Sequence, residues 1–126
     1  MNREIKFRAW YKEKKRIGKV LGIDILHKEI FFSNEDVDCY EHTDFKDVEL
    51  MQYTELKDEY GDEIYEGDIV TLHNSRYKVI FNSEEARFVL KDVFFEMDIP
   101  FTNNNNKRIE VIGNIYENSE LLGENK

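Results

Sequence analysis

Apolar and polar residues alternate in several short stretches of the chain, and a period of two predicts half-buried β-strands. The first stretch is residues 5–10, Ile5-Lys6-Phe7-Arg8-Ala9-Trp10. The same alternation runs through residues 47–53. Further strands are expected over residues 23–26, 29–32, 64–72, 76–81, 86–91 and 108–116. Short strands at this spacing are typical of a small barrel or sandwich.

Turn-forming residues separate these stretches. Gly67 tolerates a positive φ and Asp68 can bond to nearby backbone, so this pair is expected to form a tight turn. The four asparagines of residues 103–106 favour a surface loop. Ser119 is expected to cap a short helical turn over residues 119–122. Residues 33–44 are polar and acidic and favour a long loop, while strand and helix both stay open for the wider segment 33–56.

The composition indicates a folded protein. The chain has 126 residues, of which 40% are hydrophobic and 13% aromatic, enough for a modest core. This length fits one compact unit or two small lobes, residues 1–52 and 53–126. The single cysteine, Cys39, cannot form an internal disulfide. Because the chain has no signal-like or membrane-length apolar run, we expect a cytoplasmic protein with no membrane partner.

The formal charge of −9 is spread unevenly. Residues 1–20 hold eight basic and two acidic residues, so this end carries +6 and the remaining chain −15. The favoured interpretation is that the basic end faces acidic residues, within one chain or between chains. The alternative is a nucleic-acid-binding arm in which Trp10 and Tyr11 stack on bases. Its phosphate contacts would come from Lys12, Lys14, Lys15 and Arg16.

No pattern in the sequence indicates catalysis or a cofactor. Cys39 and His42 lie near Asp36, Asp38 and Asp44, but a zinc site needs about four ligands and no second cysteine exists. We therefore expect a solvated acidic loop and no metal there. The glycine-rich phosphate loops and the nucleophile motifs of known enzyme classes are missing, so no catalytic residue is expected.

Three segments, in order, resemble the YopX-like family of phage and prophage proteins. They are residues 5–10, then residues 53–58 with Gly61 and residues 64–70, and finally residues 111–118 with residues 120–122. The chain departs from the family pattern at Tyr11, where members often carry aspartate, and at Ser119, where they often carry proline. The signature positions are expected to be structural: Trp10, Gly61, Tyr65, Gly67, Asp68, Gly113 and Tyr116.

The resemblance implies a phage-derived, mostly β protein with an SH3-like barrel in the C-terminal half, residues 53–126, and self-association. From the strand pattern we expect few or short helices and a strand-rich N-terminal segment over residues 1–52, which is the candidate region for self-association. The resemblance implies no established activity, and so transfers no catalytic residue.

Three functions remain open on the sequence. The first is a non-enzymatic, self-associating interaction or assembly module, a homo-oligomer with a possible host or phage protein partner. The second is nucleic-acid binding through the basic N-terminal segment. The third is an acidic mimic of DNA that inhibits a host protein, because residues 24–68 hold 16 acidic and 3 basic residues.

Overall fold

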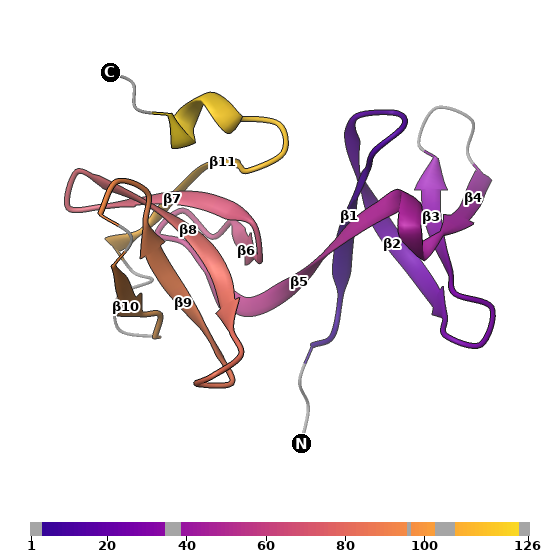
Figure 1. Cartoon of the computed structure of the whole chain (residues 1–126), viewed down its shortest axis with the longest axis horizontal. Helices are drawn as coiled ribbons and strands as arrows, with labels where there is room; N and C mark the ends of the chain where they lie inside the picture. Colours follow the sequence, from indigo (N-terminus) through magenta and orange to yellow (C-terminus); the bar gives the residue numbers. More distant parts are fainter. Residues whose placement is uncertain (1–3, 35–38, 96, 103–107, 124–126) are drawn as a thin grey trace. The chain divides into compact units, whose positions relative to one another are not determined.

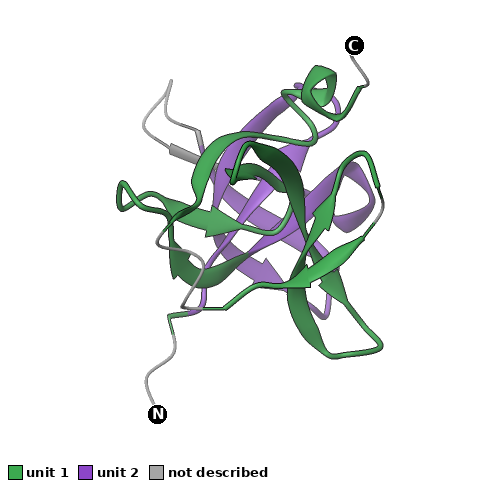
Figure 2. Cartoon of the chain, turned by 90° about the vertical axis from the view of Figure 1, so that its left-hand side faces the viewer, with its two compact units in different colours: residues 1–4, 53–126 green, residues 5–52 purple. Residues whose placement is uncertain are grey.

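The computed structural model describes residues 4–34, 39–95, 97–102 and 108–123. The chain divides into two compact units: residues 5–52 form unit 2, and residues 1–4 with 53–126 form unit 1 (Figure 2). Each unit consists of antiparallel strands, and the helical elements of the described ranges are short 3-10 turns (Figure 1). The expected mostly β fold with few, short helices is confirmed.

Unit 2 is an antiparallel sheet in the order β4-β3-β2-β1-β5. Its elements are β1 (Phe7–Tyr11), β2 (Arg16–Asp24), β3 (Glu29–Asn34), β4 (Cys39–Asp44), the 3-10 turn η1 (Phe45–Asp47) and the first residues of β5 (Val48–Lys57). One cluster of buried side chains forms its core: Ala9, Tyr11, Ile30, Phe32 and Val48. The period of two therefore places Ala9 and Tyr11 of β1 in this core, as the alternation predicted for a half-buried strand.

Unit 1 contains a five-stranded antiparallel sheet in the order β10-β9-β8-β7-β11 and the β5–β6 hairpin, in which β6 is the sixth strand of the ladder β4-β3-β2-β1-β5-β6. Its elements are β6 (Glu63–Tyr65), β7 (Asp68–Leu72), β8 (Ser75–Asn82), β9 (Arg87–Asp92), β10 (Asp98–Pro100), β11 (Glu110–Asn114) and the 3-10 turn η3 (Ser119–Leu122). Ile64 of the hairpin packs with Val70, Val79 and Leu90 of the sheet. Among the described residues, the strand ladders of neither unit close into a barrel.

The expected loop over residues 33–44 is wrong for residues 33–34, which end β3, and for residues 39–44. Residues 39–44 form β4, which pairs with β3 from Asn34↔Cys39 to Glu29↔Asp44. The ladder to β3 pairs one edge of the β4 backbone, so a polar segment forms a strand without apolar alternation. Residues 48–56 of the uncertain segment are also strand, as part of β5, and residues 35–38 lie outside the described residues.

The expected cap at Ser119 is also wrong. Ser119 is the first residue of η3, Asn118 occupies the N-cap position, and no side chain caps this turn. The carboxamide of Asn118 instead accepts a hydrogen bond from the Asn114 N–H at 3.0 Å. The short strand β10 was not anticipated by the sequence pattern, and the loop expected over residues 103–106 falls outside the described residues.

Buried side-chain oxygen atoms fix the turns of unit 1. The Asp58 carboxylate, which is only 6% exposed, accepts three backbone hydrogen bonds. Two come from the Tyr60 and Asp62 N–H groups of its own turn, at 2.9 Å each. The third comes from Val111 of β11, at 3.0 Å. One carboxylate thus shapes a turn and joins it to a strand about fifty residues away.

The expected turn at Gly67-Asp68 is confirmed. Gly67 has φ +90° and Asp68 is almost completely buried. The Asp68 carboxylate accepts a hydrogen bond from the Tyr65 N–H at 2.7 Å, which closes the turn. The Gly67 N–H donates to the Val79 carbonyl, and the Gly67 carbonyl accepts from Ile115. The turn is therefore held on both sides by neighbouring elements.

The substitution Asp58→Ala should destabilise the protein by about 3 kcal/mol, because it leaves three partly buried N–H groups without an acceptor. Chemical denaturation followed by far-ultraviolet circular dichroism measures this change, because the strands of unit 1 contribute to that signal. Asp62→Ala is the matched control, since it removes an exposed carboxylate from the same turn and should cost about 0.5 kcal/mol or less. Equal costs for the two variants would contradict the role given to Asp58.

The substitution Gly113→Ala should destabilise the protein by about 2 kcal/mol. A Cβ at this position would meet the Asn118 carboxamide oxygen at 2.5 Å, and that oxygen holds the Asn114 N–H. Gly22→Ala is the control, because the nearest atom to its Cβ would be 3.9 Å away, an ordinary contact. Thermal unfolding should therefore separate the two variants, with Gly22→Ala close to the wild type.

Candidate functional site

The basic residues that the sequence singled out lie on the β1–β2 turn and at the start of β2 in unit 2. The Lys12 ammonium is 3.2 Å from the Glu49 carboxylate and donates to the Lys46 carbonyl at 3.1 Å. The Lys14 ammonium is 3.2 Å from Glu41. Lys15 is exposed with φ +53°, and Arg16 is half-buried. Two of the four cations thus face acidic residues of the same unit.

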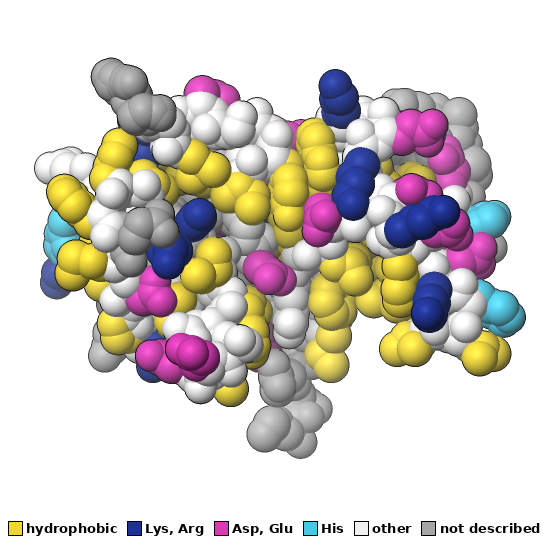
Figure 3. Space-filling view, viewed as in Figure 1, with side chains coloured by type: hydrophobic (Ala, Val, Ile, Leu, Met, Phe, Trp, Pro, Cys, Tyr) yellow, Lys and Arg dark blue, Asp and Glu magenta, His cyan; other side chains and the backbone are white. Residues whose placement is uncertain are grey.

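The surface of unit 2 shows the same mixing of charge. On the face drawn in Figure 3, basic side chains over the strands of unit 2 alternate with acidic ones. Interleaved charges screen one another, so this face offers a polyanion less attraction than a uniform basic patch would. Tyr11 is buried, which removes it from any base-stacking role of the arm.

The signature positions of the resemblance lie at turns and on strands. Gly61 has φ +88° in the turn that Asp58 caps, and Gly67 and Asp68 form the tight turn described above. Tyr65 packs against Tyr53 with ring centroids 5.4 Å apart and donates its hydroxyl hydrogen to Glu63. Gly113 leaves room for Asn118, while the Tyr116 N–H donates to the Asn114 carboxamide at 3.0 Å. Trp10 lies half-buried on β1.

Cys39 and His42 both belong to β4. The His42 ring nitrogen Nδ1 lies 3.3 Å from the Glu29 carboxylate, and the ring packs near Phe31. Within the described ranges, no three or more His, Cys, Asp or Glu side chains are grouped as metal ligands would be.

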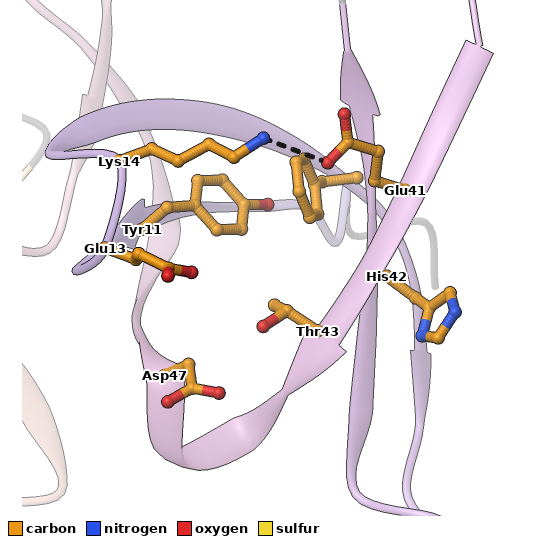
Figure 4. A pocket seen from close by; sticks show the side chains of 8 residues that line it. Tyr11, Glu13, Lys14, Glu41, His42, Thr43 and Asp47 are labelled. Carbon is orange, nitrogen blue, oxygen red and sulfur yellow. Dashed lines mark hydrogen bonds and ion pairs between the residues drawn. The ribbon is translucent and has the colours of Figure 1, made fainter.

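A polar pocket of about 110 Å³ lies in unit 2 between the β1–β2 turn and β4. Tyr11 and Phe32 supply aromatic rings to its wall, with ring centroids 3.9 Å apart. Figure 4 shows Glu13, Thr43 and Asp47 directing oxygen atoms toward the same space, while the His42 ring points away. The Lys14–Glu41 ion pair spans another side. The pocket therefore combines aromatic rings with acidic and hydroxyl groups.

Tyr11 is the unusual residue of this pocket. Its side chain is 4% exposed, and its hydroxyl has no hydrogen-bond partner among the described residues. Burial raises the pKa of this hydroxyl far above its usual range, against the opposing effect of Arg16, and Glu41 adds to the rise. A buried hydroxyl without a partner costs about 1–3 kcal/mol of stability. The Tyr11 hydroxyl is therefore a destabilising group in the core of unit 2.

Gly18 of β2 makes this position of Tyr11 feasible. A Cβ at residue 18 would lie 2.5 Å from the Tyr11 ring, so only glycine lets the ring rest against β2. The sequence did not reveal this site, because the predicted first strand ends at Trp10 and Tyr11 is interpreted only as a base-stacking residue of the basic arm. The alternation of β1 does contain the clue, since Phe7, Ala9 and Tyr11 share one face.

Comparisons with known proteins agree with the fold. The family model described as YopX protein matches residues 6–123. The crystal structure of protein EF1440 from Enterococcus faecalis is similar, with a TM-score of 0.69 and 27% sequence identity. That match covers 97% of this chain and 100% of the other. No curated protein matches.

Helices of membrane-crossing length and apolarity are missing from the described part of the chain. The family match extends over nearly the whole sequence and includes, apart from Ile5, all three segments that carried the resemblance. The chain therefore belongs to the YopX family.

Proposed function

We propose that the chain is a non-enzymatic interaction module that associates with further copies of itself. One observation carries this proposal. Each unit has a turn that is held in shape by an aspartate and that exposes two consecutive large apolar side chains. Large exposed apolar residues on a fixed backbone are typical of the central contacts of protein interfaces.

The apolar turn of unit 1 follows β9. The Asp92 carboxylate accepts hydrogen bonds from the Phe94 and Phe95 N–H groups at 2.8 and 2.9 Å. The Asp92 N–H in turn donates to the Met97 carbonyl. Phe94 is nevertheless 54% exposed and Phe95 74% exposed. The backbone is thus ordered before any partner arrives, which lowers the entropy lost on binding.

The apolar turn of unit 2 joins β2 to β3 and uses the same device. The Asp24 carboxylate accepts a hydrogen bond from the His27 N–H at 3.1 Å and lies 2.8 Å from the His27 ring nitrogen. Ile25 is 77% exposed and Leu26 84% exposed. Hydrogen bonding and charge from Asp24 raise the pKa of His27, and bonds from His27 lower the pKa of Asp24.

Open sheet edges support the same proposal. In the described residues, β4 pairs only with β3, and β10 pairs only with β9. Unpaired strand edges favour association, since a second chain can satisfy their backbone groups. Complementary charge, by contrast, contributes less to the proposed self-association than the sequence implied. Lys12 and Lys14 already form ion pairs within unit 2.

The proposal also includes three features that the sequence led us to expect. They are an SH3-like barrel in residues 53–126, a phage or prophage setting, and a cytoplasmic location. The barrel is supported by Leu56 and Ile64 of the β5–β6 hairpin, which pack on the core of the five-stranded sheet. Nucleic-acid binding and DNA mimicry rank below self-association, since no specific contact favours either.

Wild-type protein should form a complex larger than one chain, as measured by light scattering after size-exclusion chromatography. The double substitution Phe94→Ser and Phe95→Ser should shift this complex toward the monomer, because it removes both exposed aromatic rings of the turn after β9. Tyr60→Ser is the control, since it removes a single exposed aromatic residue from another capped turn.

High salt should leave the complex intact, because apolar contacts are not screened by ions. A monomeric wild type at every concentration and salt tested would refute self-association. Dissociation by salt alone would instead favour association through complementary charge.

The pKa of His27 should fall toward 6.5 in the variant Asp24→Asn, because the partner carboxylate is lost. Proton NMR of the ring during a pH titration measures it. In the wild type, the pKa of His27 is raised, so the protonated ring stabilises the turn fully below pH 6.5. This stabilisation is lost as the pH rises through the raised pKa. An unchanged pKa in the variant would show that Asp24 does not hold the ring.

A further inference from the structure

The outer edge of the unit 2 sheet is formed by β4, which pairs with β3 and with no other described strand (Figure 1). The Phe45 N–H donates to the Lys28 carbonyl at 2.9 Å, which continues the β3–β4 ladder by one residue pair. Residue pairs of an antiparallel ladder alternate between hydrogen-bonded and non-hydrogen-bonded. The backbone N–H and C=O groups of Thr43 therefore point toward β3, while those of His42 and Asp44 point away from the sheet.

The side chains of His42 and Asp44 share one face of β4. The His42 ring points away from the pocket described above (Figure 4), and this side chain is 63% exposed. Its Nδ1 lies 3.3 Å from the Glu29 carboxylate, and its Nε2 has no partner among the described residues. Asp44 lies directly opposite Glu29 in the ladder, so two like charges meet at this edge, where neither a lysine nor an arginine of the described chain pairs with Asp44. The edge thus presents an imidazole nitrogen and a carboxylate that lacks a counter-charge.

The alternation of the ladder limits how a second copy of β4 can pair with this edge. Residues whose backbone groups point outward must face each other, so His42 can face Tyr40, His42 or Asp44 of an antiparallel β4. The first register would set Glu41 opposite Glu41, and the second would set two imidazole rings together. The third register sets a basic group opposite an acidic one and Thr43 opposite Thr43, and both kinds of cross-strand pair are favourable.

We propose that two copies of the chain pair through β4 in this third register, with His42 of each copy opposite Asp44 of the other. Each of these residue pairs exchanges two backbone hydrogen bonds, and Thr43 lies on the two-fold axis. The charged imidazole donates from both ring nitrogens, to Glu29 of its own copy and to Asp44 of the other. The two unit 2 sheets then form one continuous sheet, which covers both β4 edges.

This pairing is short, and it adjoins the apolar turn of unit 2. The 3-10 turn η1 begins at Phe45, so the ladder between copies ends at Asp44. The β2–β3 turn with Ile25 and Leu26 lies at the same end of the sheet, because Glu29 at the start of β3 pairs with Asp44. The exposed apolar side chains of that turn add buried area to the contact, while the charged pair selects the register. The inference therefore rests on the proposed self-association and names one surface through which it occurs.

Disulfide cross-linking of the full chain tests the register, in a background that carries Cys39→Ser. In the variant Thr43→Cys, the new thiols face each other in a non-hydrogen-bonded pair, where Cα atoms are about 4.5 Å apart and a disulfide can form. Mild oxidation should therefore yield a covalent dimer. Glu41→Cys is the matched control on the same face of β4, and its thiols should be too far apart to join.

A cross-link in Glu41→Cys with none in Thr43→Cys would overturn the proposed register. Equal cross-linking of both variants would indicate random collisions and would overturn it as well. No cross-link in either variant would overturn the pairing through β4.

The substitution His42→Asp should weaken association about tenfold at low ionic strength, because it sets two carboxylates opposite each other at both ends of the ladder. Sedimentation velocity over a concentration series measures this change. Adding Asp44→His to the same chain exchanges the two groups and should restore association, which a merely structural loss would not allow. His73→Asp is the matched control at an exposed turn of unit 1 and should associate as the wild type does.

Failure of this pairing and failure of self-association give different results. A monomeric wild type refutes self-association, and the pairing with it. A wild type that associates, and whose association His42→Asp leaves unchanged, refutes only the pairing through β4. A double variant as weak as His42→Asp alone refutes the register, and equal weakening by His73→Asp means that only net charge matters and refutes the pairing.

Discussion

Hydrogen bonds from turn backbone to buried or half-buried side-chain oxygen atoms are the interaction on which this fold depends. The described elements are strands and brief 3-10 turns, so no long helix supplies local hydrogen bonding. Asp58, Asp68 and Asn114 satisfy the backbone where strands end. A strand register is fixed by the turn that precedes it, and a shift of one residue exchanges its faces. These side-chain oxygen atoms thereby determine which residues of each strand point into the core.

Hydrogen bonds from turn backbone to aspartate side chains also occur at the surface. Asp24 and Asp92 cap turns whose tips carry exposed apolar side chains. A turn without such a cap would sample many conformations. Binding of a partner to its apolar side chains would then cost more conformational entropy. The fold thus uses one kind of bond both to set its sheets and to hold two apolar turns in fixed positions.

The sequence predicted much of this fold and little of the site. Alternation located β1, β8 and β9 within one or two residues, and Gly67-Asp68 identified a tight turn. It failed for β4, whose backbone ladder tolerates Glu41 and His42 without an apolar pattern. It also missed the pocket, because Tyr11 gains its surroundings from Gly18 of β2, Phe32 of β3 and the side chains of β4, which come near it only in the folded chain. Long-range contacts of this kind leave no local pattern.

The central claim is that side-chain oxygens hold the turn backbone in place. Native-state hydrogen exchange tests it directly, because it reports the opening of each amide separately. The account predicts that the amides of Asp62, Tyr65, Val111 and Glu117 exchange as slowly as those of the adjoining strands. The turn amides of His73 and Asn74 serve as the comparison, since no side-chain oxygen caps them in the described structure. Equal, fast exchange in both sets would contradict the account.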